Sequence, residues 1–278
     1  MEYSEEHECT RTKMQQFRTK LEIKMKVDDF KIKVDDFKTG LKTRIDDDKM
    51  KLLIFTDSRG QHKQGDSQLY WERLADDSEY QVDCYICPYK WTTTLDFLEL
   101  IFNGQIDPRS YDAIILHTGI VEWSPRSWSN AFNDLYNPVN TRNGKKTFAD
   151  WLFGEDVMEK YLTEMFSVEY EGEPTMNLYS LDMLKHKVLP YLRTIPNLIW
   201  ISCNPIILEW RGTYSRDRPE NIRLVEYYSE EMTKGLQHVV DLNGWTDAEV
   251  KQYTLDNIHL TSAGSDYIYE RIIEYLAK

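Results

Sequence analysis

The sequence predicts a three-layer α/β/α fold built on a mostly parallel sheet of five strands. Strand-like apolar runs alternate with helix-like segments from about residue 50 to the last residue. Strands spaced by helices form right-handed βαβ units, which make the strands parallel and cover both faces of the sheet. In addition, the polar residues best suited to chemistry follow the predicted strands, where the active sites of such sheets form.

Each predicted element rests on an apolar pattern of strand or helix length. Short runs rich in Ile, Leu, Val and Tyr predict strands at 51–55, 80–86, 112–117, 197–203 and 238–242. Longer patterns with helical spacing predict helices at 68–74, 94–102, 148–166, 178–192, 221–235 and 262–276. The connections at 122–150 and 205–219 are long for this fold and rich in Trp, Arg, Asn and Tyr, which is typical of binding walls.

Residues 1–49 differ from the rest of the chain. They hold 12 basic and 12 acidic residues, so the net charge of −13 lies on residues 50–278. The sequence KVDDFK at 26–31 repeats at 33–38, and an offset of seven returns to the same side of a helix. We therefore predict a coiled-coil segment at 1–49, with homo-oligomer contacts through residues 20–45, and one globular domain at 50–278. A short strand or a flexible charged tail is the alternative for the first segment.

Composition and charge exclude several classes of partner. With 34 basic against 47 acidic residues and no glycine-rich phosphate motif, we expect no nucleic acid and no anionic membrane surface as partner. The charged N-terminus and the lack of a run of about 18 apolar residues predict no signal peptide and no membrane span. The default location is therefore the cytoplasm, with a virion or surface assembly as the alternative.

Neither the cysteines nor the histidines have the spacing of a metal site. Cys84 and Cys87 form a C-x-x-C sequence, but it lies in a strand-like segment and no second pair completes a zinc site. Four cysteines in a chain of 278 residues also do not indicate a disulfide framework. We expect no metal and no cofactor.

Two stretches at opposite ends of the predicted domain supply a nucleophile, a base and an orienting carboxylate. The first predicted strand ends in Thr56-Asp57-Ser58-Arg59-Gly60, which holds the Ser58 hydroxyl at the mouth of the strand. Asp256 and His259 lie three residues apart, just before the last predicted helix. We predict that His259 accepts the proton of Ser58, that Asp256 orients the imidazole, and that Ser58 attacks an ester carbonyl. Taken singly, each of these residues would be explained as a helix cap.

This pattern resembles the SGNH, or GDSL-like, hydrolase superfamily from about Met50 to the C-terminus. The first block of the family, a strand followed by G-D-S, reads Thr56-Asp57-Ser58 here. The last block, D-x-x-H before a small-residue turn and a helix, reads Asp256-Asn257-Ile258-His259. The resemblance implies a flavodoxin-like arrangement of the layers and a catalytic triad of Ser58, Asp256 and His259. No G-x-S-x-G sequence is present, so the elbow of α/β-hydrolases is not the better match.

The two middle blocks depart from the family pattern. The third block, G-x-N-D, reads Gly119-Ile120-Val121-Glu122, so valine replaces the amide that helps to bind the oxyanion. The second block, G-x-T-S-x-D, begins with Trp91 where the family has glycine. Loss of one oxyanion donor commonly lowers the rate by a factor of about 100 to 1000. A weakly catalytic or non-catalytic scaffold is therefore an alternative.

The run from Gly119 to Arg126 is similar to a G-I-V-D-C-A-P-R variant of SGNH-like proteins that are encoded beside surface-polysaccharide genes. In that variant Val121 is the norm, and the resemblance leaves Asn204, His117, Arg126 or a backbone amide to bind the oxyanion. The residues we predict to contact the oxyanion or the substrate are Arg59, Trp91, Gly119, Val121, Arg126 and Asn204.

Together these features predict a serine esterase that acts on acyl groups, chiefly O-acetyl, of a carbohydrate or polysaccharide, that is, a glycan deacetylase. The 8 Trp and 18 Tyr agree with a carbohydrate partner, because aromatic residues are frequent on surfaces that meet sugars. One alternative is a glycan O-acyltransferase that uses the same serine. The other is a structural or glycan-binding protein on the same scaffold, such as a multimeric virion or surface component, which the repeat at 26–38 favours.

Overall fold

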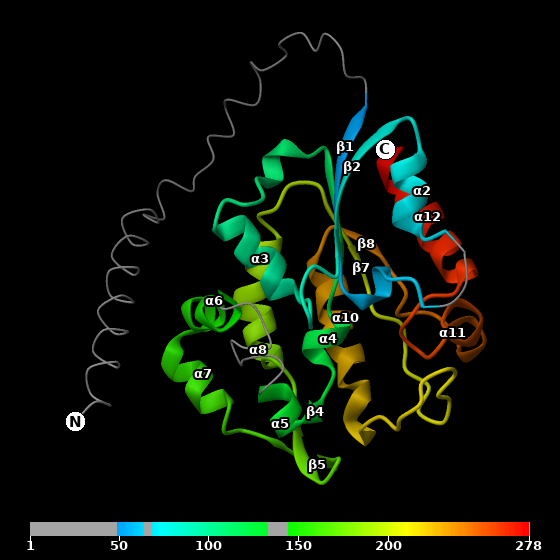
Figure 1. Cartoon of the computed structure of the whole chain (residues 1–278). Coiled ribbons are helices and arrows are strands. Elements are labelled where there is room, and N and C mark those ends of the chain that lie inside the picture. Colours follow the sequence, from blue (N-terminus) through cyan, green and yellow to red (C-terminus); the bar gives the residue numbers. More distant parts are fainter. Residues whose placement is uncertain (1–48, 64–67, 133–143, 278) are drawn as a thin grey trace, which may run out of the picture. The chain divides into compact units, whose positions relative to one another are not determined.

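The structure is a computed structural model, and it describes residues 49–63, 68–132 and 144–277. The predicted coiled coil at 1–49 lies outside the described residues apart from Lys49, so the oligomer contacts predicted for residues 20–45 stay a prediction. From Met50 onward, strands and helices alternate along the chain (Figure 1).

Five parallel strands form the central sheet in the order β2-β1-β3-β7-β8. This confirms the predicted parallel sheet of five strands. The strand order places the first strand near the middle, so the residues that follow it lie at the centre of the carboxyl edge. The strands are β1 (Met50–Thr56), β2 (Tyr80–Ile86), β3 (Ala113–His117), β7 (Leu198–Ile201) and β8 (His238–Val240).

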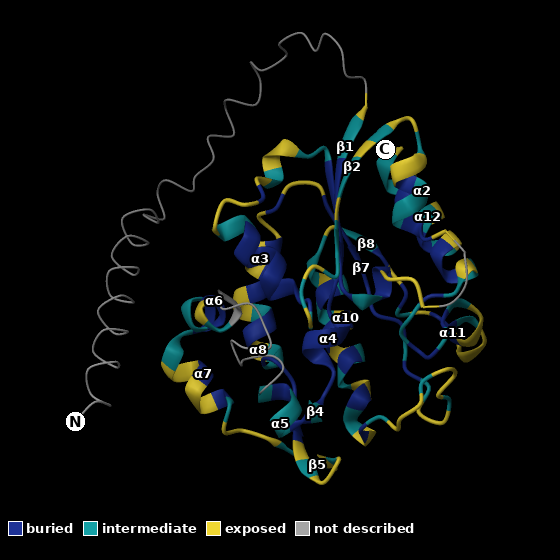
Figure 2. Ribbon diagram, in the orientation of Figure 1, coloured by how far each residue is buried: buried dark blue, intermediate teal, exposed yellow. Residues whose placement is uncertain are grey.

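Helices cover both faces of this sheet, and each face has its own apolar core. Because side chains alternate along a strand, Leu52 and Ile54 of β1 enter one core and Leu53 and Phe55 enter the other. The first core contains residues of α2 (Tyr70–Asp76), α11 (Asp247–Tyr253) and α12 (Ser262–Leu276). The second contains residues of α3 (Thr94–Phe102) and α10 (Leu224–Gly235). Figure 2 shows the buried residues gathered along the strands and on the sheet-facing sides of these helices.

A long excursion between β3 and β7 adds short helices and a small antiparallel sheet of order β4-β6-β5. The sequence did not predict this second sheet. Its strands are β4 (Arg126–Ser127), β5 (Phe166–Tyr170) and β6 (Glu173–Met176). The helical segments of the excursion are α4 (Ile120–Trp123), α5 (Trp128–Ala131), α6 (Gly144–Phe153), α7 (Glu155–Tyr161), α8 (Leu181–Met183), η5 (Leu184–Val188) and α9 (Leu189–Leu192).

The helix predicted at 148–166 is wrong in its extent. It is divided at Gly154, whose φ of 101° lies outside the helical range and suits a residue without a Cβ. It also ends before residue 166, where β5 begins. The turn between β5 and β6 places Glu171 and Gly172 at φ values of 56° and 81°, which is the backbone conformation of a tight hairpin.

The other predicted helices differ from the structure mainly at their ends. The helix predicted at 221–235 begins as the 3-10 turn η6 (Glu220–Arg223). Helix α11 was not predicted, although Thr246 and Glu249 form a capping box at its start. Among the helices of the described residues, none combines the length and the apolar character needed to cross a bilayer.

Candidate active site

Ser58 lies directly after β1, at the start of the 3-10 turn η2 (Ser58–Gly60). Asp57 caps this turn, because its Oδ1 accepts a hydrogen bond of 2.9 Å from the backbone N–H of Arg59. Gly60 closes the turn against Thr56, and a Cβ at Gly60 would overlap with the Thr56 side chain. The local sequence therefore holds the half-buried Ser58 hydroxyl at the carboxyl edge of the sheet.

Ser58, His259 and Asp256 form a continuous chain of hydrogen bonds. The Oγ of Ser58 lies 3.2 Å from Nε2 of His259, and Nδ1 of His259 lies 2.8 Å from Oδ2 of Asp256. With the carboxylate accepting a hydrogen bond from Nδ1–H, the neutral imidazole carries no proton on Nε2. This nitrogen faces the serine hydroxyl, as a general base requires. The structure thus brings together the three residues that the sequence predicted as nucleophile, base and orienting group.

Asp256 is positioned by the backbone that follows it. Its Oδ1 accepts hydrogen bonds from the N–H groups of Ile258 and His259, at 3.1 and 2.8 Å. Burial favours a higher pKa, since only 6% of the side chain is exposed, but the hydrogen bonds and the charge of His259 outweigh it and lower the pKa of Asp256. Asp256 is thus a carboxylate at neutral pH and favours the imidazolium that forms when His259 takes a proton.

Asn257 fixes the loop between Asp256 and His259. Its backbone has a φ of 71°, a conformation that asparagine tolerates better than most residues. Its Oδ1 accepts a hydrogen bond from the N–H of Ile207 at 2.8 Å, and its Nδ2 donates to the carbonyl oxygen of Trp210 at 2.6 Å. The segment after β7 therefore holds the loop that presents His259.

Two further residues bind this loop from the same side. Asn204 was predicted to contact the oxyanion, but its Nδ2 donates to the carbonyl oxygens of Asn257 and Pro205, at 2.9 and 2.8 Å. Arg218, which the sequence did not single out, donates from Nη2 to the carbonyl oxygen of Asp256 at 2.5 Å, and the same nitrogen lies 3.9 Å from Oδ2 of Asp256. The only sequence signal for Arg218 was its place at the end of a long, arginine-rich connection.

Gly119 follows β3, and Ser58 follows β1, the neighbouring strand of the sheet. Thr56 pairs with His117 in the parallel register, and the N–H of Asp57 donates to the carbonyl oxygen of His117 at 3.0 Å. Ser58 and Gly119 each come two residues after this last pair of the register. Neither N–H group makes a backbone hydrogen bond to another described residue. These two amides are the candidate donors to an oxyanion.

Only glycine fits at position 119. Its φ is 131°, and a Cβ would overlap with the ring of Trp123, which is completely buried. Val121, at the position where the resembled pattern has an amide side chain, is a buried member of the second core. Its side chain contributes packing and has no hydrogen-bond donor, so the donor that Val121 can offer is its backbone N–H group.

Trp91 has a left-handed backbone conformation. Its φ of 59° lies in the left-handed region that glycine adopts freely and that a bulky side chain rarely does. The guanidinium of Arg126 stacks over its ring at 4.1 Å from the centroid, and Nη2 of Arg126 donates to the carbonyl oxygen of Val121 at 3.1 Å. Trp91 and Arg126 thus connect the segment after β2 to the segment after β3.

Arg59 has a different place from the one predicted. Its guanidinium is buried and forms an ion pair with Asp57, with Nη2 at 2.9 Å from Oδ2. Its backbone N–H donates to Asp57 as well. Burial disfavours the charged form of Arg59, but the neighbouring carboxylate outweighs this and raises its pKa above the ordinary value. The backbone N–H and the guanidinium of Arg59 therefore both stabilise the turn that holds Ser58.

A buried carboxylate that the sequence analysis did not assign lies behind Gly119. Glu122 is completely buried, and its Oε1 accepts hydrogen bonds from the N–H and the hydroxyl of Thr94, at 2.9 and 2.5 Å. The Thr94 hydroxyl also lies 2.7 Å from that of Thr118. Burial raises the pKa of Glu122 to about 7, although the hydrogen bonds from Thr94 act in the opposite direction. Glu122 thereby ties the start of α3 to the loop that contains Gly119.

His117 is a core residue. It has no exposed surface, and its Nδ1 lies 3.1 Å from the hydroxyl of Tyr70. Burial and, to a smaller extent, the charge of Arg59 lower the pKa of His117 well below its ordinary value, so the imidazole is neutral. In the described part of the chain, no group of three His, Cys, Asp or Glu side chains is arranged to hold a metal ion.

Comparisons with known proteins find similar solved structures. No family model and no curated protein matches the chain. A protein from Lactobacillus plantarum has a TM-score of 0.46 and 15% identity, covering 82% of this chain and 97% of that one. A lipase/acylhydrolase from Enterococcus faecalis has a TM-score of 0.44 and 13% identity, covering 82% and 95%. An acetylxylan esterase from Geobacillus stearothermophilus has a TM-score of 0.42 and 14% identity, covering 82% and 94%.

Proposed function

We propose that this chain is a serine ester hydrolase that removes acetyl or similarly small acyl groups from a carbohydrate. The observation that supports this function is the hydrogen-bonded chain from Ser58 through His259 to Asp256, with distances of 3.2 and 2.8 Å. Its nucleophile follows the first strand of a parallel sheet, at the edge where such folds bind substrates.

In the proposed reaction, Ser58 Oγ attacks the ester carbonyl while Nε2 of His259 takes the hydroxyl proton. Asp256 stabilises the imidazolium, and the backbone N–H groups of Ser58 and Gly119 face the negative oxygen of the tetrahedral intermediate. His259 then gives the proton to the leaving sugar hydroxyl, which leaves an acyl group on Ser58. A water molecule, deprotonated by His259, attacks this acyl-enzyme and releases the carboxylic acid.

The first test measures p-nitrophenyl acetate hydrolysis and acetate release from acetylated xylobiose and cellobiose. We expect hydrolysis by the wild-type protein and a loss of about 1000-fold or more in Ser58→Ala. Ser78→Ala, at an exposed position on the loop before β2, is the matched control and should keep the wild-type rate. Equal rates from Ser58→Ala and the wild type would refute the proposal.

Two further measurements separate hydrolysis from acyl transfer and from sugar binding without catalysis. Acyl transfer to an added sugar that is faster than release of the free acid would identify a transferase that uses the same serine. Sugar binding that survives Ser58→Ala, with no turnover of any ester, would identify a binding scaffold.

A further inference from the structure

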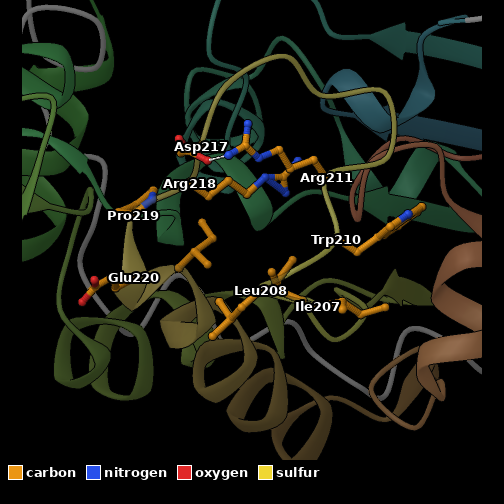
Figure 3. Close-up of a pocket in the computed structure, with 10 residues that line it drawn as sticks. Ile207, Leu208, Trp210, Arg211, Asp217, Arg218, Pro219 and Glu220 are labelled. Carbon is orange, nitrogen blue, oxygen red and sulfur yellow. Dashed lines mark ion pairs between the residues drawn. The ribbon is translucent and has the colours of Figure 1, made fainter.

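A pocket of about 350 Å³ is formed by the segment after β7. Its lining residues all lie between Ile206 and Ile222, in the stretch that connects β7 to α10 (Figure 3). Because this stretch leaves the carboxyl end of β7, the pocket lies at the same edge of the sheet as Ser58. Its volume is at the lower end of the range of about 300 to 1000 Å³ found for small-molecule sites.

The wall of the pocket is fastened to the loop that presents His259. Ile207 and Trp210 hydrogen-bond through their backbones to the side chain of Asn257, at 2.8 and 2.6 Å. Arg218, another lining residue, donates to the carbonyl oxygen of Asp256 at 2.5 Å. The wall of the pocket is therefore held in a fixed relation to the loop that carries Asp256 and His259.

One side of the pocket is aliphatic. Ile206, Ile207, Leu208 and Ile222 line it, and Leu208 is 50% exposed, so its side chain is open to a ligand. Figure 3 shows Ile207 and Leu208 on the side opposite Arg211, Asp217 and Arg218, whereas the Trp210 ring points away from them. The side chains offered to a ligand on this side are thus aliphatic.

The charged residues of the lining balance one another. They supply two guanidinium groups, of Arg211 and Arg218, and two carboxylates, of Asp217 and Glu220. Figure 3 shows Glu220 apart from the other three. Arg211 and Asp217 form an ion pair and are 57% and 71% exposed, so both remain accessible to a ligand. An anionic ligand would gain from the arginines but be repelled by the carboxylates. A neutral polyol uses both, because each hydroxyl can donate to a carboxylate and accept from a guanidinium.

We propose that this pocket binds a neutral saccharide unit of the substrate. The C–H face of the ring would pack on Leu208 and its aliphatic neighbours, and the hydroxyls would bond to Arg211, Asp217 and Glu220. The inference deepens the proposed function and rests on it for the position of the ester, since the bound sugar would be the leaving group or its neighbour in the glycan.

A direct test measures binding without catalysis. Ligand-observed NMR would follow xylobiose, cellobiose, maltose and lactose with the wild-type protein and with Leu208→Asp and Asp217→Ala. We expect at least one disaccharide to bind and each variant to weaken its binding by about tenfold or more, a loss of about 1.4 kcal/mol. Val157→Asp places the same charge at a 48% exposed aliphatic residue of α7 and should bind like the wild type.

A kinetic test connects the pocket to the ester. Leu208→Asp should lower kcat/KM for an acetylated disaccharide at least about tenfold more than kcat/KM for p-nitrophenyl acetate, which lacks the sugar. Disaccharide binding that is sensitive to Leu208→Asp, with no ester hydrolysed, would support the pocket and refute the esterase. No binding of any of the four disaccharides, or binding that Leu208→Asp and Asp217→Ala leave unchanged, would overturn the inference even if esters were hydrolysed.

Discussion

We expect Glu122→Gln to remove part of the dependence of folding stability on pH between pH 5 and 8. Glu122 is completely buried, and the donors that reach its Oε1 come from a single residue, Thr94. Burial raises its pKa from the ordinary 4.5 to about 7. Glutamine has nearly the same shape and can accept the same hydrogen bonds, but it carries no charge at any pH.

The magnitude follows from the two pKa values. They differ by about 2.5, and one unit corresponds to about 1.36 kcal/mol, so the full effect is about 3 kcal/mol. Because the pKa is higher in the folded state, the folded protein keeps a proton that the unfolded chain has lost. This stabilising contribution is complete below the unfolded pKa and is lost as the pH rises through the folded pKa. Between pH 5 and 8, about 2 to 3 kcal/mol should be lost.

The assay is urea unfolding of the wild type and Glu122→Gln at several pH values, followed by tryptophan fluorescence. The quantity to compare is the difference in unfolding free energy between the two proteins. Buried His117 is present in both, and its lowered pKa makes its contribution to stability rise with pH, opposite to that of Glu122. From pH 5 to pH 8, the unfolding free energy of Glu122→Gln should rise by about 2 to 3 kcal/mol relative to that of the wild type. Glu159→Gln, at an exposed position of α7, should show no such trend. A difference constant to within about 0.5 kcal/mol would refute the reasoning.

Three further substitutions test other parts of the site. Asp256→Asn should lower kcat for p-nitrophenyl acetate about 10⁴-fold with little change in circular dichroism, because it allows the wrong imidazole tautomer; a loss below tenfold would contradict the assigned role. Gly119→Ala should lower both the melting temperature and kcat, because its Cβ meets the buried ring of Trp123; unchanged values would show that the loop can move. Arg59→Met should lower the free energy of unfolding by about 3 to 5 kcal/mol, since it leaves the carboxylate of Asp57 buried without its partner; denaturant titration that finds less than about 1 kcal/mol would show that solvent replaces the guanidinium.

The inner strands of the sheet were predictable because both of their faces are covered, so that β3 and β7 are apolar and buried along nearly their whole length. The bounds of β2, α3 and α12 agree with the prediction residue for residue. The β5–β6 hairpin was missed because apolar residues from α6 to β5 merge into one helical pattern, and the Glu171-Gly172 turn is a weak signal. The spacing of apolar residues does not show the point at which the helix ends and the strand begins.

The candidate triad was predictable because each of its members has a distinct chemical role and a recognisable sequence context. The sequence named several candidate oxyanion donors, Gly119 among them, but it did not decide between side chains and backbone amides, because that choice depends on the folded environment of each residue. The orientation of Arg59 and Asn204 depends on partners that only the folded chain supplies, namely Asp57 and the Asn257 carbonyl. A sequence indicates which side chains can form strong hydrogen bonds, but the partners of those hydrogen bonds are decided by contacts between residues that are far apart in the chain.

The distance along the chain between the two ends of the site has a consequence for biosynthesis. Ser58 and His259 are separated by 201 positions, and α12, which follows His259, packs against the same sheet face as α2. A ribosome-bound chain that has already formed β1, β3 and β7 still lacks His259, the partner of the Ser58 hydroxyl. The hydrogen bond between these two side chains therefore forms only after the chain beyond His259 has left the exit tunnel.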